Sequence, residues 1–157
     1  KPNIACAEGA RRVRIDRAIN DNEVCDVNTF GVIATQAAYD RGGEWLDALI
    51  GYLQANYACM REFCERNLPD FPISRLEGTY LVWMDCRVLG RSSEELERQL
   101  IDRAGLWLNA GSMYGAAGEG FMRWDNARPR TTLIRGMLRS SDFVSAENPD
   151  VTRGLSS

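Results

Sequence analysis

Residues 114–130 read YGAAGEGFMRWDNARPR, and this stretch predicts how the chain folds around a site. Gly115, Gly118 and Gly120 predict a sharply turning loop, because glycine adopts backbone angles that other residues resist. A short apolar strand follows and delivers Arg123, whose planar fork of donors suits a carboxylate. We therefore predict an anion-binding arginine at the mouth of a pocket. The alternative is a strand arginine in a surface salt bridge.

The glycine loop does not predict a nucleotide site. It opens a strand rather than a helix, and no Gly-Lys-Ser or Gly-Lys-Thr follows it, so the phosphate cradle at a helix N-terminus is missing. No pair of carboxylates is placed to indicate glycosidase-type acid–base chemistry.

The composition predicts a folded protein that does not bind nucleic acid or membranes. With 157 residues, 45% of them hydrophobic, the chain can bury the core of one ordinary domain. A net charge of −3 gives no electrostatic reason to expect nucleic acid or an anionic membrane. No apolar run approaches the roughly 18 residues that a membrane span needs. Because the chain begins with Lys1 rather than Met, we expect a fragment or a processed product.

The absence of histidine excludes several classes of site within this chain. Zinc sites that use imidazole, Ser-His-Asp triads and Cys-His dyads all need a histidine. The five cysteines are odd in number and scattered, which argues against a disulfide framework and for buried, reduced thiols. We expect no metal site.

Hydrophobic periodicity predicts a small α/β layer domain with the order helix, helix, strand, helix, strand, strand, helix. A short amphipathic helix is also compatible with the arginine-rich part of residues 1–27. The expected elements are a helix from Thr29, as its cap, to Gly42; a long helix over 44–67; and a central strand over 79–85. There follow a helix capped by Ser92 and ended by Gly105, a strand over 106–111, the Arg123 strand and a helix capped by Thr131 or Thr132. The long helix carries an apolar stripe from Trp45 to Phe63, expected to pack in a core or between domains.

Three long stretches carry a resemblance to a known family. They are GGEWLDALIGYLQANY (42–57), LEGTYLVWMDCRVLG (76–90) and NAGSMYGAAGEGFMRW (109–124). Together they resemble the C-terminal part of the pyridoxal-phosphate-dependent class I/II aminotransferase superfamily, and they are most similar to its cystathionine β-lyase-like C–S lyase branch. The resemblance runs from Asn22 to Leu138.

The resemblance implies the C-terminal domain of the aspartate aminotransferase-like fold, an α+β domain with a short, mostly antiparallel sheet packed with helices. Residues 1–27 are then a remnant of the large cofactor-binding domain, and 28–68 are interdomain helices. Residues 69–144 form the small C-terminal domain, and 145–157 are a flexible tail.

The resemblance also implies an activity for the parent protein. Pyridoxal 5'-phosphate, held by a lysine, would support β-elimination from cystathionine or another cysteine conjugate to a thiol, pyruvate and ammonia. Arg123 would bind the α-carboxylate of this small amino-acid substrate. The family implies a cytoplasmic homodimer. Because most cofactor contacts belong to the large domain, we expect the isolated chain to be inactive.

The sequence departs from the family pattern at its start and just after Arg123. The chain starts Lys1-Pro2-Asn3-Ile4-Ala5, whereas the family motif around the catalytic lysine resembles Lys-Thr-Phe-Asn-Ile-Ala. Lys1 is either a remnant of the Schiff-base lysine or a chance match. Asp125 stands where the family usually has Asn, and Arg128 where it has a small residue or Cys. We expect Asp125 to be able to pair with Arg123 and compete with substrate.

Two alternatives to the lyase stay open. The same fold and the same carboxylate-binding arginine would serve an aminotransferase. A truncated, non-catalytic module that binds a partner through the stripe from Trp45 to Phe63 is the second alternative.

Overall fold

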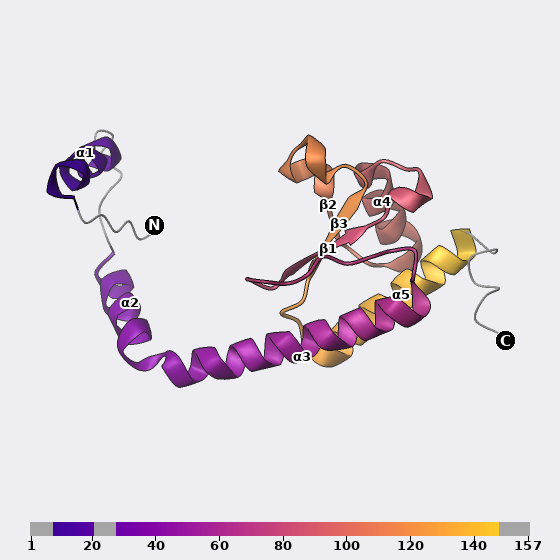
Figure 1. Cartoon of the computed structure of the whole chain (residues 1–157), viewed down its shortest axis with the longest axis horizontal. Coiled ribbons are helices and arrows are strands. Elements are labelled where there is room, and N and C mark those ends of the chain that lie inside the picture. Colours follow the sequence, from indigo (N-terminus) through magenta and orange to yellow (C-terminus); the bar gives the residue numbers. More distant parts are fainter. Residues whose placement is uncertain (1–7, 21–27, 148–157) are drawn as a thin grey trace. The chain divides into compact units, whose positions relative to one another are not determined.

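The computed structural model describes residues 8–20 and 28–147, and the chain divides into two compact units, residues 1–47 and 48–157. Figure 1 shows the order of the elements along the chain. Lys1 and the expected tail beyond residue 147 lie outside the described residues. No helix in the described part of the chain combines the length and the apolar character needed to cross a membrane.

The described part of the first unit contains the helices α1 (Gly9–Asn20) and α2 (Thr29–Arg41) and the first residues of a third helix. The prediction that Thr29 caps α2 is wrong, because Asn28 takes that role. The Asn28 side-chain oxygen accepts hydrogen bonds from the main-chain nitrogens of Phe30 (2.9 Å) and Gly31 (3.4 Å), which the helix itself leaves unpaired. No residue of α2 is buried.

The long helix α3 (Gly43–Asn67) confirms the predicted span and runs from the first unit into the second. Only Asn56, Met60 and Cys64 are buried along it. The apolar stripe is therefore packed only in its C-terminal half, and Trp45 near its start is 69% exposed.

The second unit contains a three-stranded antiparallel sheet with the order β1-β3-β2. The strands are β1 (Leu81–Asp85), β2 (Asn109–Ala110) and β3 (Phe121–Asp125), so the predicted second strand shrinks to two residues. The prediction that β1 is the central strand is wrong, because β3 takes the centre. The outer edge of β1 pairs instead with the preceding segment, where Ser74 N donates to Trp83 O at 2.7 Å.

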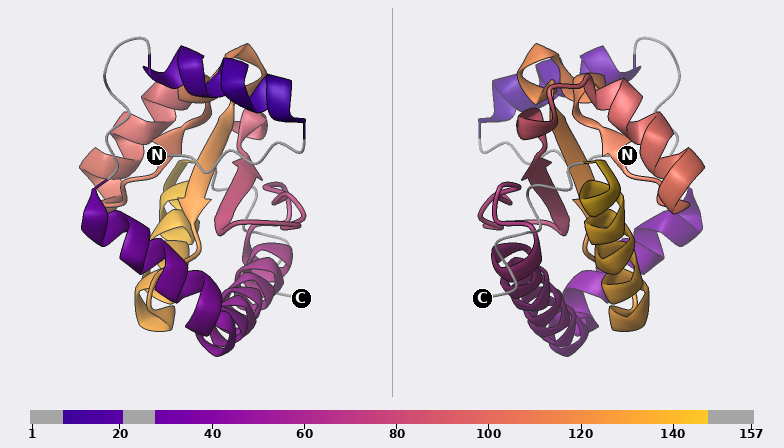
Figure 2. Two further views of the ribbon diagram at one scale, coloured as in Figure 1. Left: turned by 90° about the vertical axis from the view of Figure 1, so that its left-hand side faces the viewer. Right: turned by 90° about the vertical axis from the view of Figure 1, so that its right-hand side faces the viewer.

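The core lies between one face of this sheet and the helices, and Figure 2 shows α5 (Arg130–Glu147) crossing that face. Alternation along the strands places Val82 and Met84 of β1 and Met122 and Trp124 of β3 on this inner face. Buried residues from the helices join this cluster, among them Met60, Cys64, Leu96, Leu100, Leu133, Met137, Phe143 and Val144.

The remaining helix ends agree only partly with the predictions. The Ser92 hydroxyl accepts from Glu95 N at 3.2 Å and caps α4 (Ser93–Gln99), as predicted. A π-helical turn (Leu100–Ala104) extends α4, and Gly105, with a φ of 58°, ends it as predicted. The predicted cap of the last helix is wrong, because α5 already begins at Arg130, and the carbonyl oxygen of the preceding Pro129 accepts from Thr132 N and Leu133 N. The helix also runs to Glu147, two residues beyond the predicted start of the tail.

Candidate anion-binding cleft

Arg123 lies in the middle of the central strand, and its side chain is on the face opposite the core. Its main chain is paired on both sides, with Trp83 of β1 and with Asn109 of β2. The neighbours Met122 and Trp124 are buried in the core, so alternation places the half-buried Arg123 on the outer face. The sheet therefore fixes the backbone from which the guanidinium extends.

An aromatic ring supports the guanidinium from one side. The Cζ atom of Arg123 lies 4.4 Å from the centroid of the Tyr114 ring, a cation–π contact. Tyr114 is itself held by two neighbours: Trp83 meets it edge to face at 5.4 Å between centroids, and Asn109 Nδ2 donates to its hydroxyl at 3.3 Å. The contact between Tyr114 and Arg123 was not predicted from the sequence. The position of Tyr114 at the start of the glycine loop that leads to Arg123 could have indicated it.

The glycine loop positions Tyr114 by close backbone contact. A Cβ on Gly118 would lie only 2.2 Å from Gly111 O, so the two chain segments touch through their main chains. Gly115 and Gly120 have φ angles of 114° and 80°, the left-handed region that the sequence predicted for this loop. Ser93 of α4 anchors the loop, because its hydroxyl accepts from Gly120 N at 2.7 Å.

Arg123 lines an open cleft of about 430 Å³, a volume typical of sites for small molecules. Two arginines and one aspartate line the cleft, which leaves one net positive charge. The other lining residues are Tyr80, Leu81, Trp107, Leu108 and Asn109.

The pairing of the charged groups leaves Arg123 available to an anion. Asp125 pairs with Arg128, with Oδ2 and Nε 3.3 Å apart. The expected pairing of Asp125 with Arg123 is therefore not found. Within the described residues no carboxylate forms an ion pair with Arg123, whose contact is the Tyr114 ring. Arg123 therefore lines the cleft without being neutralised by a carboxylate of the described residues.

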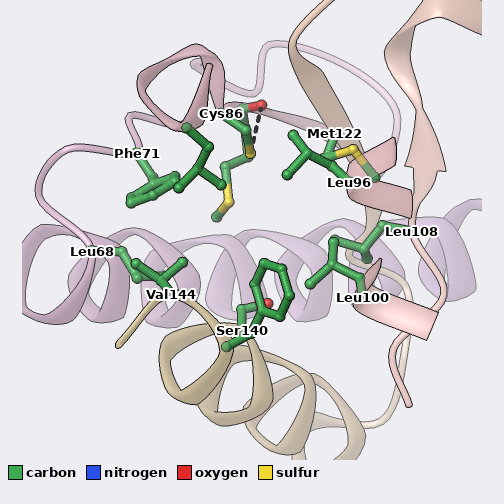
Figure 3. A pocket seen from close by; sticks show the side chains of 12 residues that line it. Leu68, Phe71, Cys86, Leu96, Leu100, Leu108, Met122, Ser140 and Val144 are labelled. Atoms are coloured by element: carbon green, nitrogen blue, oxygen red, sulfur yellow. Dashed lines mark hydrogen bonds between the residues drawn. The ribbon is translucent and has the colours of Figure 1, made fainter. Parts of the chain in front are cut away.

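A second hollow lies inside the core and does not suit a substrate. It is lined mostly by apolar side chains from α4, α5, the sheet and the segment that follows α3, among them Phe71, Leu96 and Met122 (Figure 3). Its volume of about 20 Å³ holds roughly one water molecule. The Cys86 thiol on its wall donates to Met84 O at 3.8 Å. This hollow is a packing defect of the core.

The other candidate groups do not join the cleft. The described residues contain no cluster of three or more potential metal ligands. Cys64 and Cys86 are buried free thiols, and Cys59 is a partly exposed one. Burial raises the pKa of Cys64 and of Cys86 to about 12, so neither serves as a nucleophile near neutral pH. Cys6 and Cys25 lie outside the described residues.

Comparison with curated proteins identifies relatives. No family model matches the chain. Cystathionine β-lyase PatB of Bacillus subtilis is 33% identical over 135 residues, which cover 86% of this chain and 35% of PatB. Protein MalY of Escherichia coli is 34% identical over 110 residues, covering 70% of this chain and 28% of MalY. The chain thus spans about a third of the length of the curated relatives it matches.

Comparison with solved structures gives the same answer. Cystalysin from Treponema denticola, whose structure contains pyridoxal 5'-phosphate, superposes with a TM-score of 0.85 at 27% identity and covers 92% of this chain and 36% of cystalysin. The fold is therefore that of pyridoxal-phosphate-dependent aminotransferase-like enzymes, as the resemblance implied. The chain belongs to the cystathionine β-lyase-like C–S lyase branch of the class I/II aminotransferase superfamily and corresponds to the C-terminal part of its members.

Proposed function

We propose that this chain supplies the substrate-carboxylate site of a pyridoxal-phosphate-dependent C–S β-lyase. In this proposal Arg123 binds the α-carboxylate of a cysteine conjugate, and the parent protein splits the conjugate into a thiol, pyruvate and ammonia. The observation that carries the proposal is an arginine without an ion-pair partner in the described chain, stacked on Tyr114 and lining a cleft of substrate size.

The geometry supports carboxylate binding for two reasons. Arg123 Cζ lies over the Tyr114 ring at 4.4 Å from its centroid, and no carboxylate of the described residues pairs with the guanidinium, whose planar fork suits a bidentate contact with a carboxylate. The Arg128–Asp125 pair neutralises the other charges of the cleft, so the remaining positive charge is that of Arg123. Fixing the carboxylate in this way would hold the substrate in one orientation.

The described residues do not by themselves form a site for pyridoxal phosphate. The cofactor needs a lysine, and Lys1, the only lysine of the chain, lies outside the described residues. The contribution of these residues is limited to binding and orienting the substrate. A role for Lys1, the homodimer, the cytoplasmic location and the domain boundaries that the resemblance implied stay predictions.

The full-length protein offers the direct test of this function. Pyruvate release from cystathionine is measured for the wild type and for Arg123→Gln. Loss of a charge-assisted bidentate contact is expected to raise KM by about 10- to 100-fold. Arg135→Gln, on the exposed part of α5, removes the same charge away from the cleft and serves as the control. An unchanged KM in Arg123→Gln would show that the substrate carboxylate binds elsewhere.

Transamination is the main alternative reaction, since it uses the same carboxylate contact. Formation of a keto acid that depends on an added amino acceptor would favour it over elimination. The interaction-module alternative has its own support, because α2 and the start of α3 expose large apolar side chains, including Phe30 at 81% and Trp45 at 69%.

A further inference from the structure

The loop that follows Arg123 is tied to α3 by buried amides. Asn56 of α3 is fully buried, and its Nδ2 donates to Asn126 O at 2.9 Å and to Arg128 O at 3.0 Å. Its Oδ1 accepts from Arg130 Nε at 2.6 Å. These three hydrogen bonds of the Asn56 side chain all go to residues between 126 and 130.

Asn126 also forms a hydrogen bond between this loop and α3. It is also fully buried, and its Nδ2 donates to Leu53 O of α3 at 3.0 Å. Its main-chain nitrogen donates to Tyr80 O at 2.8 Å, which extends the β1–β3 ladder by one residue. Asn126 therefore joins the sheet and α3 at the point where β3 ends.

This connection lies on the core side of the strand that carries the guanidinium on its outer side. Asn126 is three residues after Arg123, so alternation places the two side chains on opposite faces of β3. Buried amides with specific partners fix one arrangement, because any shift leaves a buried polar group without a hydrogen bond. A displacement of the strand end would also move the guanidinium relative to Tyr114.

We propose that Asn56 and Asn126 form an amide clamp, a pair of positioning residues that ties the end of β3 to α3 and thereby sets where the Arg123 guanidinium lies. That this position matters for substrate rests on the proposed function, whereas the clamp itself does not. Neither residue touches the cleft, and neither is a catalytic residue.

The test measures the position of Arg123 in the 157-residue chain by NMR. Protons of the Arg123 side chain above the Tyr114 ring experience a ring-current shift to high field. Asn56→Asp keeps the acceptor for Arg130 and removes both donors, and it is expected to abolish most of this shift. Asn126→Leu removes only the donor to Leu53 O and an oxygen that has no hydrogen-bond partner among the described residues. If Asn56→Asp does not fold, this second variant still tests whether the clamp sets the position of Arg123.

Asn67→Asp is the matched control, since Asn67 is on the same helix and donates to Phe63 O at 2.9 Å, away from the loop. The clamp predicts that this control keeps the ring-current shift. Retention of the shift in folded Asn56→Asp or Asn126→Leu would overturn the proposal, and so would an equal loss in Asn67→Asp.

A second measurement separates this proposal from the proposed function. The dissociation constant for S-methyl-L-cysteine is determined for the same chains. If Arg123 binds carboxylate, the clamp variants should weaken binding by about 10-fold, because displacements near 1 Å are costly to a bidentate contact. If the wild type does not bind the probe but its ring-current shift depends on Asn56 and Asn126, the clamp stands and the carboxylate role fails.

Discussion

At the scale of single residues, the chemistry of the cleft depends on how Arg123 is supported. Its guanidinium lies 4.4 Å from the Tyr114 ring centroid, and it has no ion pair within the described residues. A lysine would not replace it well, because an ammonium group has no planar fork and cannot bind a carboxylate bidentately in the same way. The planar shape of the guanidinium therefore matters in addition to its charge, and the Tyr114 ring supports it from one side.

Replacing Tyr114 by Leu should weaken carboxylate binding without abolishing it. A cation–π contact contributes about 0.5–1 kcal/mol at a partly exposed site, which corresponds to a loss of about 2- to 5-fold in affinity. The dissociation constant for S-methyl-L-cysteine measures this change. Tyr80→Leu is the control, since Tyr80 lines the same cleft but does not stack on Arg123. Equal effects of the two substitutions would contradict the stacking role.

The three described cysteines should react with iodoacetamide at different rates. At pH 8 the buried thiols of Cys64 and Cys86, whose pKa burial raises to about 12, stay protonated, so partly exposed Cys59 should be alkylated first. Peptide mass spectrometry over time gives the order, and unfolding in guanidinium should equalise the three rates. Rapid labelling of Cys86 in the folded chain would contradict its burial.

The same thiols make a signed prediction for stability against pH. A folded-state pKa of about 12, above the ordinary value of 9.0, means that the folded chain keeps protons that the unfolded chain loses. This contribution is fully present below pH 9 and is lost as pH rises toward 12. The free energy of unfolding should fall over that window, and the fall should shrink in the Cys86→Ala variant, as denaturant titrations at several pH values can measure.

At the scale of elements, the sequence predicted features that depend on local chemistry. The Ser92 cap, the Gly105 stop and the span of α3 follow from capping residues and periodicity, and the structure has all three. The strand order was not predictable in the same way. Apolar residues on both faces suggested that β1 was central, but Trp83 is covered by Tyr114 on the outer face rather than by a second layer of helices.

The amide clamp was not predicted, although one polar residue in the apolar stripe of α3 could have indicated it. Asn56 occupies a stripe position between Leu53 and Met60, where an apolar residue is expected at a spacing of three or four. A polar residue at a core position indicates a buried hydrogen-bonding partner. That partner is about 70 residues away in the sequence, so only the folded chain identifies it.

The loop between β2 and β3 should not tolerate a side chain at Gly118. A Cβ there would lie 2.2 Å from Gly111 O, a contact with rigid backbone, and relieving such an overlap costs about 1–3 kcal/mol or more. Gly118→Ala should lower the free energy of unfolding by that amount in urea titrations. Gly78→Ala, where a Cβ meets no atom within 4 Å, should be close to neutral. Equal stability of the two variants would refute the close packing of this loop.

At the scale of the whole molecule, α2 exposes a large apolar surface in this chain. None of its residues is buried, and Phe30 and Tyr39 are 81% and 80% exposed. An exposed apolar patch of this kind typically marks an interaction surface. The isolated chain should consequently self-associate.

Sedimentation velocity measures this self-association. The double variant Phe30→Ser/Tyr39→Ser should shift the chain toward monomer, because it removes two large apolar groups from the same exposed helix. Val88→Ser, which changes a 52% exposed apolar residue outside that helix, is the control. A monomeric wild type at concentrations near 100 μM would show that α2 does not drive association.

Binding of an amino acid by its acid group is measured most directly by comparing S-methyl-L-cysteine with its carboxamide. The two ligands differ only in whether a carboxylate is available to the Arg123 guanidinium. The account predicts that the chain binds the acid at least about tenfold more tightly than the amide, and that Arg123→Gln removes this difference while Arg135→Gln keeps it. Equal binding of acid and amide by the wild type, or an undiminished preference in Arg123→Gln, would contradict it.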